Sequence, residues 1–302
     1  MASPRPSLLV LLAFASIYLV WGSTYLAIRI ALETLPPFTM AGIRYLFAGI
    51  VLGAVAWRRG APPVRAAHLG PALLLGALLF LGGNGSVVWA EQRISSGLAA
   101  LLIASEPLWV ALLLLRRAEE RPSPRVFGAI ALGLLGLAIL TDPFSGKAAA
   151  DLLGSGVVVL GALSWAAGSL ASRTATLPSS PVQSGALQMA AGGAILLLCG
   201  AASGEFGRIV WSAVSLRSAL ALSYLALFGS IVAFTAYLWL LKVADPSLVS
   251  TYAFVNPVVA VLLGWGVGGE ALSVRMAVAA ALIVLAVVLI TSGRKRRPAP
   301  GS

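Results

Sequence analysis

Long apolar stretches alternate with short polar connectors along the whole chain. Each stretch covers about 20 positions, the length that an α-helix needs to cross the hydrocarbon core of a bilayer. The connectors hold turn-forming pairs such as Pro36-Pro37 and Asp245-Pro246, and none is long enough for a soluble domain. The pattern predicts ten transmembrane helices, at residues 8–32, 38–57, 69–90, 96–115, 125–141, 152–172, 182–203, 218–241, 248–267 and 274–291.

Composition places these helices in lipid. Of the 302 residues, 59% are apolar and 10% are charged, with a mean hydropathy of +0.96. Soluble domains carry about 25% charged residues, so this chain has too few polar side chains to solvate a globule of its size. We expect an all-α integral membrane protein. Residues 8–28 lack a small-residue cleavage site, which favours a first transmembrane helix over a signal peptide.

Basic residues give the chain a net charge of +11 and are scattered over the connectors. Such scatter indicates membrane topology and not a phosphate-binding surface, so no nucleic-acid partner is expected. With a cytoplasmic N-terminus, the inside connectors hold fourteen Lys and Arg residues and the outside connectors hold five. Because basic residues accumulate on the cytoplasmic side, both termini are predicted to be cytoplasmic, with residues 292–302 as a basic tail.

The second half of the sequence repeats the first. Between residues 89 and 141 the offset is 150 without a gap, and the first two spans repeat at an offset of 144. The matched pairs include Trp89/Trp239, Pro107/Pro257, Glu120/Glu270, Arg125/Arg275, Trp21/Trp165, Arg29/Arg173, Pro37/Pro181 and Gly49/Gly193. Residues 1–141 and 151–291 are therefore expected to form two five-helix units. Because five is odd, the second unit enters the membrane from the opposite side, as in the inverted repeats of many secondary transporters.

These motifs resemble the EamA-type branch of the drug/metabolite transporter superfamily. The resemblance rests on Trp21-Gly22-Ser23, on Pro36-Pro37 with Arg44-Tyr45, on Glu106-Pro107 and Asn256-Pro257, and on the linker Glu270-Ala271-Leu272-Ser273. It implies ten helices around a central cavity and export of amino acids, metabolites or drugs across a bacterial inner membrane. The family transports many solutes, so the motifs do not name the substrate, and the sequence leaves the oligomeric state open.

Glu106 is the residue most in need of an explanation. It is about the eleventh residue of its span, which places it roughly 16 Å deep, near the bilayer midplane. An unpaired carboxylate there costs at least ~2.5 kcal/mol, so it must be protonated, paired or facing water. Arg44 is the candidate partner from the sequence. Two interpretations stay open: a buried ion pair that locks helices together, or a carboxylate that binds a proton or solute.

Further polar and aromatic residues at mid-depth are candidates for lining a cavity or for packing in the core. Aromatic belts lie at the membrane interfaces, so a belt does not explain Trp21. Asn84 is expected in a cavity wall or a helix contact, and close helix packing explains its glycine neighbours. The candidate cavity residues are Trp21, Ser23, Thr24, Tyr25, Arg44, Asn84, Glu106, Trp165, Ser169, Gln188 and Asn256. Pro107 and Pro257 are predicted to kink their helices, as static bends or as hinges.

The leading hypothesis is a secondary transporter that exports small solutes by alternating access, with or without proton coupling. An uncoupled facilitator of the same fold is the alternative. One cysteine, Cys199, and one histidine, His68, cannot form a familiar metal site, and no nucleotide-binding motif is present, so no metal or cofactor is expected. An intramembrane enzyme would need paired catalytic groups that the sequence lacks. A purely structural protein would not need a midplane carboxylate.

Overall fold

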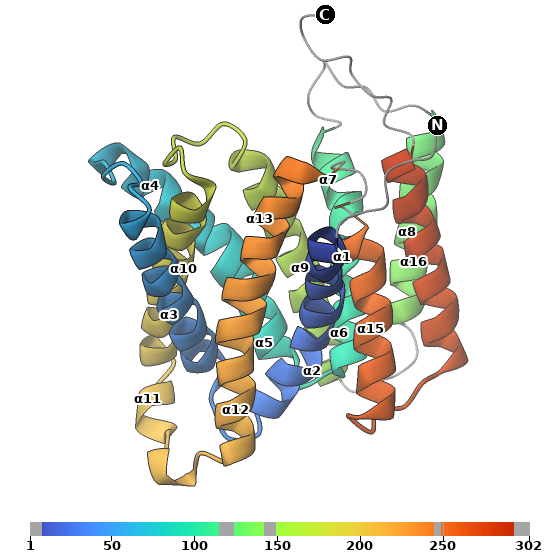
Figure 1. Ribbon diagram of the computed structural model, residues 1–302. Coiled ribbons are helices and arrows are strands. Elements are labelled where there is room, and N and C mark those ends of the chain that lie inside the picture. The colour runs from blue at the N-terminus through green and yellow to red at the C-terminus, as the bar shows by residue number, and fades with distance from the viewer. Residues whose placement is uncertain (1–7, 115–123, 142–148, 245–248, 250, 293–302) are drawn as a thin grey trace, which may run out of the picture.

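The chain folds into a bundle of helices that run up and down the molecule (Figure 1). The structure, a computed structural model, describes residues 8–114, 124–141, 149–244, 249 and 251–292, and the regular elements of these residues are all helical. In the first half they are α1 Leu8–Ala15, η1 Ser16–Val20, α2 Trp21–Ala31, α3 Pro37–Arg58, α4 Ala66–Leu75, η2 Gly76–Gly85, α5 Ser86–Ala90, α6 Ser96–Ile103, α7 Glu106–Leu114 and α8 Pro124–Thr141.

The second half contributes further helices. They are α9 Ala149–Ala171, α10 Pro181–Ala202, α11 Glu205–Arg208, η3 Trp211–Ala213, α12 Leu216–Tyr224, η4 Leu225–Val232, α13 Ala233–Val243, α15 Tyr252–Gly266 and α16 Val274–Ser292. The chain runs down through α1 and α2 and returns upward through α16 (Figure 1). Consequently α1 begins and α16 ends toward the same end of the bundle.

Seven of these helical stretches are long and apolar enough to cross a membrane. They are Leu8–Ala31, Pro37–Arg58, Ala66–Ala90, Ser96–Leu114, Leu152–Ala171, Pro181–Ala202 and Leu216–Val243. Shorter apolar helices, Phe127–Ile139, Val255–Gly266 and Val274–Leu289, lie within the fifth, ninth and tenth expected spans. The all-helical membrane class is thus supported, whereas the number of ten spans and their inverted arrangement stay predictions.

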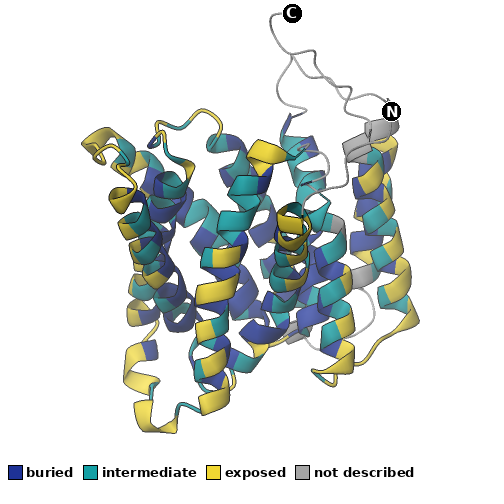
Figure 2. Cartoon of the chain, in the orientation of Figure 1, coloured by how far each residue is buried: buried dark blue, intermediate teal, exposed yellow. Residues whose placement is uncertain are grey.

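Apolar side chains cover the outside of the bundle as well as its core. Leu160, Leu198 and Val274 are 65%, 69% and 82% exposed, on helices of the second half. Exposed residues follow the outward faces of the helices, and buried residues lie between them (Figure 2). A soluble protein rarely exposes so much apolar surface, whereas lipid covers it without cost.

Glycines allow several helices to pack closely. A Cβ on Gly49 of α3 would lie 2.6 Å from the Ala190 nitrogen, and a Cβ on Gly193 of α10 would lie 2.4 Å from the Leu46 nitrogen. A Cβ on Gly83 would lie 2.7 Å from the ring of Trp165. The packing explanation for the glycines of the third span is therefore confirmed, because a larger residue there would push α9 away.

Three membrane-crossing stretches contain π-helical segments, η1, η2 and η4. In η2 the side-chain amide of Asn84 donates to the Leu79 carbonyl, and in η4 the Ser230 hydroxyl donates to the Leu225 carbonyl. Each acceptor lies five residues before its donor. Segments of this kind are frequent at functional sites and leave backbone groups to be satisfied by side chains.

Contacts that join the two halves lie at the lower end of the bundle in Figure 1, which we call the closed end. The Glu205 carboxylate accepts hydrogen bonds from the Phe38 and Thr39 amides and from the Thr39 hydroxyl, at 3.2, 2.7 and 2.7 Å. The Ser218 hydroxyl donates to the Ile30 carbonyl at 3.0 Å. A helix N-terminus leaves amide donors without partners, so a carboxylate from the opposite half stabilises the start of α3.

Glu270 has the same role for α6. Its carboxylate accepts from the Ser96 amide and hydroxyl at 2.8 and 2.7 Å and from the Gly97 amide at 3.0 Å. It also forms an ion pair of 3.3 Å with Arg29 of α2. We call Arg29, Glu270 and the capped start of α6 the Glu270 latch.

Candidate functional site

The fourth expected span is broken beside Glu106. Helix α6 ends at Ile103 and α7 begins at Glu106, so Ala104 and Ser105 separate them. The Ser105 hydroxyl donates to the Leu102 carbonyl at 2.6 Å. Pro107 lies directly after the break, where it cannot donate to a carbonyl of α6. The sequence predicts a kink at Pro107, and the helix break lies directly before it.

Arg44 does not pair with Glu106, although it was the expected partner. Arg44 is only 5% exposed, and its Nε donates to the Ser230 hydroxyl at 2.9 Å. Its guanidinium also lies 4.6 Å from the centre of the Tyr45 ring. The Glu106 carboxylate has neither a hydrogen bond nor an ion pair with any residue that the structure describes. A static ion pair between these two residues is therefore not present.

Aromatic rings lie near the Glu106 carboxylate. The Trp21 ring is 5.4 Å from Tyr237 and 5.1 Å from Tyr252, and those two tyrosines are 5.8 Å apart. Glu106 interacts electrostatically with both tyrosines. We call Trp21, Tyr237 and Tyr252 the aromatic triad. A carboxylate beside such rings can hold a proton or attract a cation, since ring faces and a negative charge both favour positive groups.

Asn256 lies on α15 one turn after Tyr252. With its amide nitrogen turned toward them, it lies within 3.1–3.2 Å of the carbonyls of Ile17, Tyr18 and Tyr252. The first two belong to the π-helical segment η1. A Cβ on Gly22 would lie 3.2 Å from the Asn256 carbonyl, so α2 passes close to α15 here. The amide thus joins the first and ninth expected spans beside the aromatic triad.

A second group of predicted residues meets at η4. The Trp21 Nε1 donates to the Gly229 carbonyl at 2.9 Å, and Arg44 binds the adjacent Ser230. A Cβ on Gly229 would lie 3.1 Å from the Thr24 methyl group and 3.2 Å from an Arg44 nitrogen. Trp21 therefore connects this group with the aromatic triad. The predicted residues Trp21, Thr24, Arg44, Glu106 and Asn256 lie in one continuous region.

The remaining predicted residues make other contacts. The Ser23 hydroxyl shares a hydrogen bond of 2.7 Å with the Tyr224 hydroxyl, and Tyr25 interacts electrostatically with Glu91. Asn84 uses an amide hydrogen inside its own helix, and Gln188 donates to Ser184 one turn away. Trp165 packs against Gly83, and Ser169 accepts from Ser172 through its carbonyl. No contact given by the structure brings these residues of the second half, Trp165, Ser169 and Gln188, to Glu106.

Pro257 differs from Pro107. It lies inside α15, which runs from Tyr252 to Gly266 without a break. The interruption of this span precedes the proline, at Thr251. The Tyr18 hydroxyl shares a hydrogen bond with the Thr251 hydroxyl at that point. The bend or hinge predicted at Pro257 is therefore not matched by a helix end.

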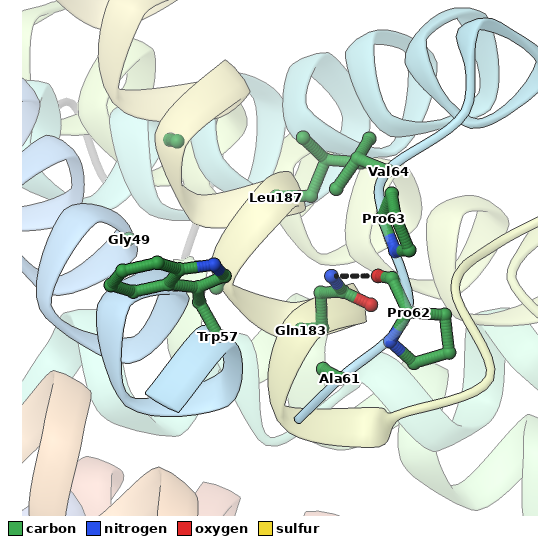
Figure 3. A pocket seen from close by; sticks show the side chains of 11 residues that line it. Gly49, Trp57, Ala61, Pro62, Pro63, Val64, Gln183 and Leu187 are labelled. Atoms are coloured by element: carbon green, nitrogen blue, oxygen red, sulfur yellow. Dashed lines mark hydrogen bonds between the residues drawn. The ribbon is translucent and has the colours of Figure 1, made fainter. Parts of the chain in front are cut away.

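A groove of about 430 Å³ lies elsewhere, between α3 and α10 (Figure 3). Its lining is mostly apolar and includes Gly49, Trp57, Pro62 and Leu187. Gln183 crosses its floor and donates to the Pro62 carbonyl at 2.7 Å. Glu106 and the aromatic triad do not line this groove. Among the described residues no group of three His, Cys, Asp or Glu side chains is placed to hold a metal ion.

Several residues of the region were missed from the sequence. Tyr237 and Tyr252 occupy positions that the repeat matches to Val87 and Leu102, so a search for shared polar pairs passed over them. Ser230 was missed because a serine in an apolar stretch has no distinctive pattern. The spacing of Tyr252 and Asn256, four residues apart on one helix face, was the signal available for this face of α15.

Known proteins match nearly the whole chain. The sequence model of the EamA-like transporter family matches residues 7–142 and again residues 152–292. The inner membrane transporter YedA of Escherichia coli (strain K12) is 42% identical over 290 residues, covering 95% of this chain and 92% of its own. The WAT1-related protein At3g02690, chloroplastic, of Arabidopsis thaliana is 28% identical, covering 90% and 67%.

The fold also has a solved counterpart. A crystal structure superposes with a TM-score of 0.64 at 25% sequence identity, covering 95% of this chain and 98% of the other. The related proteins are named as transporters, which points to transport and away from enzyme chemistry, and YedA is named for the inner membrane. The apolar helices agree with a multi-pass protein of such a membrane. The chain therefore belongs to the EamA-like transporter family.

Proposed function

We propose that this protein is a proton-coupled secondary transporter that exports small metabolites, amino acids or drug-like solutes across the inner membrane. The observation that carries the proposal is the Glu106 carboxylate, which lies at a helix break beside the aromatic triad without a bonded cation among the described residues. A charge inside a membrane protein is tolerated when it is neutralised or reached by water. A proton or a positively charged part of the solute supplies that neutralisation.

The aromatic triad gives the solute a binding surface. Its rings contribute apolar area together with the polar groups of two tyrosines, which suits solutes with an apolar body and one charged end. Trp21 and Arg44 bind the η4 segment of the second half, so solute binding and contact between the halves share residues. This connection supports a mechanism in which residues 1–141 and 151–291 move against each other.

Transport by this mechanism needs no nucleotide. A solute and a proton compete for the same carboxylate, so a proton that enters displaces a solute that leaves. An uncoupled facilitator would use the same helices without that competition, and it is the alternative.

Flux into proteoliposomes tests the proposal. Amino acids, sugars and amphipathic cations are first screened by thermal shift of the purified protein, and the solutes that stabilise it are then followed in vesicles. We expect saturable solute flux into the vesicles. This flux should speed up when the proton gradient is directed outward, so that protons leave as the solute enters. Flux that ignores the pH gradient would favour the facilitator, and no flux for any stabilising solute would contradict transport.

A further inference from the structure

Glu91 is a buried carboxylate that the proposed solute site does not use. It directly follows α5, outside the membrane-crossing stretch Ala66–Ala90, and is 5% exposed. Both of its carboxylate oxygens are buried, and neither has a hydrogen-bond partner among the described residues. A buried polar group without a partner is rare in folded proteins, and a buried charge without one is rarer still.

The positive groups near this end of the bundle have other partners. Arg29 is bound to Glu270, and Arg217 forms an ion pair of 3.2 Å with Glu33. Arg93, two residues after Glu91, lies over the Trp89 ring at 3.8 Å. Arg208 donates to the Ser203 carbonyl at 2.6 Å. None of these four cations has an ion pair with Glu91.

The groups that face Glu91 favour its neutral form. Burial raises the pKa of Glu91 well above its usual range, the Glu270 carboxylate raises it further, and the Arg29 guanidinium opposes them. Tyr25 of α2 also interacts with it electrostatically. Of the elements packed against α5, α3 carries Arg44, Tyr45 and Arg58, α9 carries Asp151 near its start, and η2 carries no titratable group.

We propose that Glu91 is a proton-binding site, separate from Glu106, and that loss of its proton opens the Glu270 latch. The proposal rests on the movement of two halves in the proposed function. With its proton, Glu91 is a neutral neighbour, and Arg29 stays on Glu270. Once the proton leaves to water, two carboxylates face one guanidinium in a buried place, and repulsion between them favours separation of the halves.

The sign of the pH dependence follows from the two states. In the open state water reaches Glu91, and its pKa returns toward the ordinary value of about 4.3. Between that value and the raised pKa of the closed state, the closed state holds one proton more than the open state. The ratio of open to closed protein therefore rises with pH across this window, by at most about tenfold per pH unit. Below the window both states hold the proton, and above it neither does.

Distances between spin labels across the closed end test the proposal. Cysteines replace the exposed residues Gln92 and Ser212, on opposite halves, in full-length protein with Cys199→Ser, and the labelled protein is placed in lipid nanodiscs. We expect two distances, a short one and a longer one. The ratio of the long-distance to the short-distance population should grow by up to about tenfold per pH unit inside the window. The Glu91→Gln protein should stay closed at every pH, because the amide of glutamine does not titrate and stays neutral.

Glu33→Gln is the matched control, since Glu33 lies at the same end in a surface ion pair and should leave the response unchanged. A distance distribution that ignores pH, or a Glu91→Gln protein with the wild-type response, would overturn the proposal. So would a shift caused by exchanging choline for sodium ions at constant pH, because it would assign the site to a metal cation.

Infrared spectra cover the case in which Glu91→Gln does not fold. In Glu106→Gln protein at a pH below the midpoint of the distance change, the carbonyl stretch of a protonated carboxylic acid should remain, and its absence would overturn the proposal. Neither measurement uses solute flux. Transport without a pH-dependent distance would leave the proposed function standing and remove the role of Glu91.

Discussion

Glu106 and Arg44 are both buried ionisable residues, but they differ in the partners that surround their side chains. Arg44 donates a hydrogen bond to the Ser230 hydroxyl and lies against the Tyr45 ring, and both are favourable partners for a guanidinium. Glu106 has no such partner among the described residues and depends on what enters the site. In the proposed mechanism the two residues serve different purposes, fixed structure for Arg44 and exchangeable binding for Glu106.

Glu106→Gln should leave the protein stable. Because the described residues hold no cation against Glu106, neutralising it breaks no ion pair, and the free energy of unfolding should change by less than about 0.5 kcal/mol. Glu270→Gln is the comparison, since it weakens four contacts and leaves Arg29 without its anion. It should cost about 1.5–3 kcal/mol. Melting temperatures of the purified variants measure the difference, and equal losses would contradict the distinction.

Tyr252→Leu should weaken solute binding by about 3- to 10-fold, the worth of one aromatic contact. The ring lies in the triad beside Glu106, whereas Trp265 lies on the same helix and is 57% exposed to the outside. Trp265→Leu is therefore the control and should leave affinity unchanged. Binding is measured by thermal shift with a transported solute. Unchanged affinity in a folded Tyr252→Leu protein would remove the triad from the site.

At the level of elements, small residues decide how closely carboxylates can approach helix ends. A Cβ on Gly264 of α15 would lie 2.5 Å from a Glu270 oxygen, so the latch requires glycine there. Likewise, a Cβ on Gly200 of α10 would lie 3.1 Å from a carboxylate oxygen of Glu205. Both carboxylates stabilise a helix start in the other half.

Gly264→Ala should therefore break the latch. The added methyl group displaces the Glu270 carboxylate from the amides of Ser96 and Gly97, and the unsatisfied donors should cost about 1–3 kcal/mol. Gly266→Ala, two residues later in the same helix, meets open space and should be neutral or slightly stabilising. Thermal unfolding of both variants separates the two effects. A stable Gly264→Ala protein with an unchanged melting temperature would show that the latch contributes little.

Apolar patterning was sufficient to place most helices, because lipid imposes a minimum length on each. The break at Pro107 was also foreseeable, since proline acts on its own helix. Partners across helices were not foreseeable: Arg44 was assigned to Glu106, yet it binds Ser230, and nothing in the sequence pointed to the ion pair between Arg29 and Glu270. Depth along a span can be estimated from the sequence, but the direction in which a side chain points depends on helix rotation and on π-helical register.

For the whole molecule, the closed end in Figure 1 fixes one conformational state. The Glu205 contacts, the Glu270 latch and the Ser218 bond all join the two halves at this end. If the predicted topology and the proposed mechanism hold, this end faces outward, a solute would enter this state from the cytoplasm, and separation of these contacts would release it outside.

The topology itself predicts where reporters should appear. A fusion after Ser302 should lie in the cytoplasm, and one inserted within residues 145–150 should lie outside, because the connector charges are fourteen against five. Enzymatic reporters that are active on only one side of the membrane make the measurement. An extracellular C-terminus would contradict the model of ten spans.

The most direct test of the account is solute flux in proteoliposomes carrying Glu106→Gln, with and without a pH gradient. If a proton shares this carboxylate with the solute, the amide mimics the protonated form. The variant should then stay folded, lose flux driven by the pH gradient, and keep some downhill or exchange flux. A folded Glu106→Gln protein whose pH-dependent flux equals that of the wild type would contradict the account.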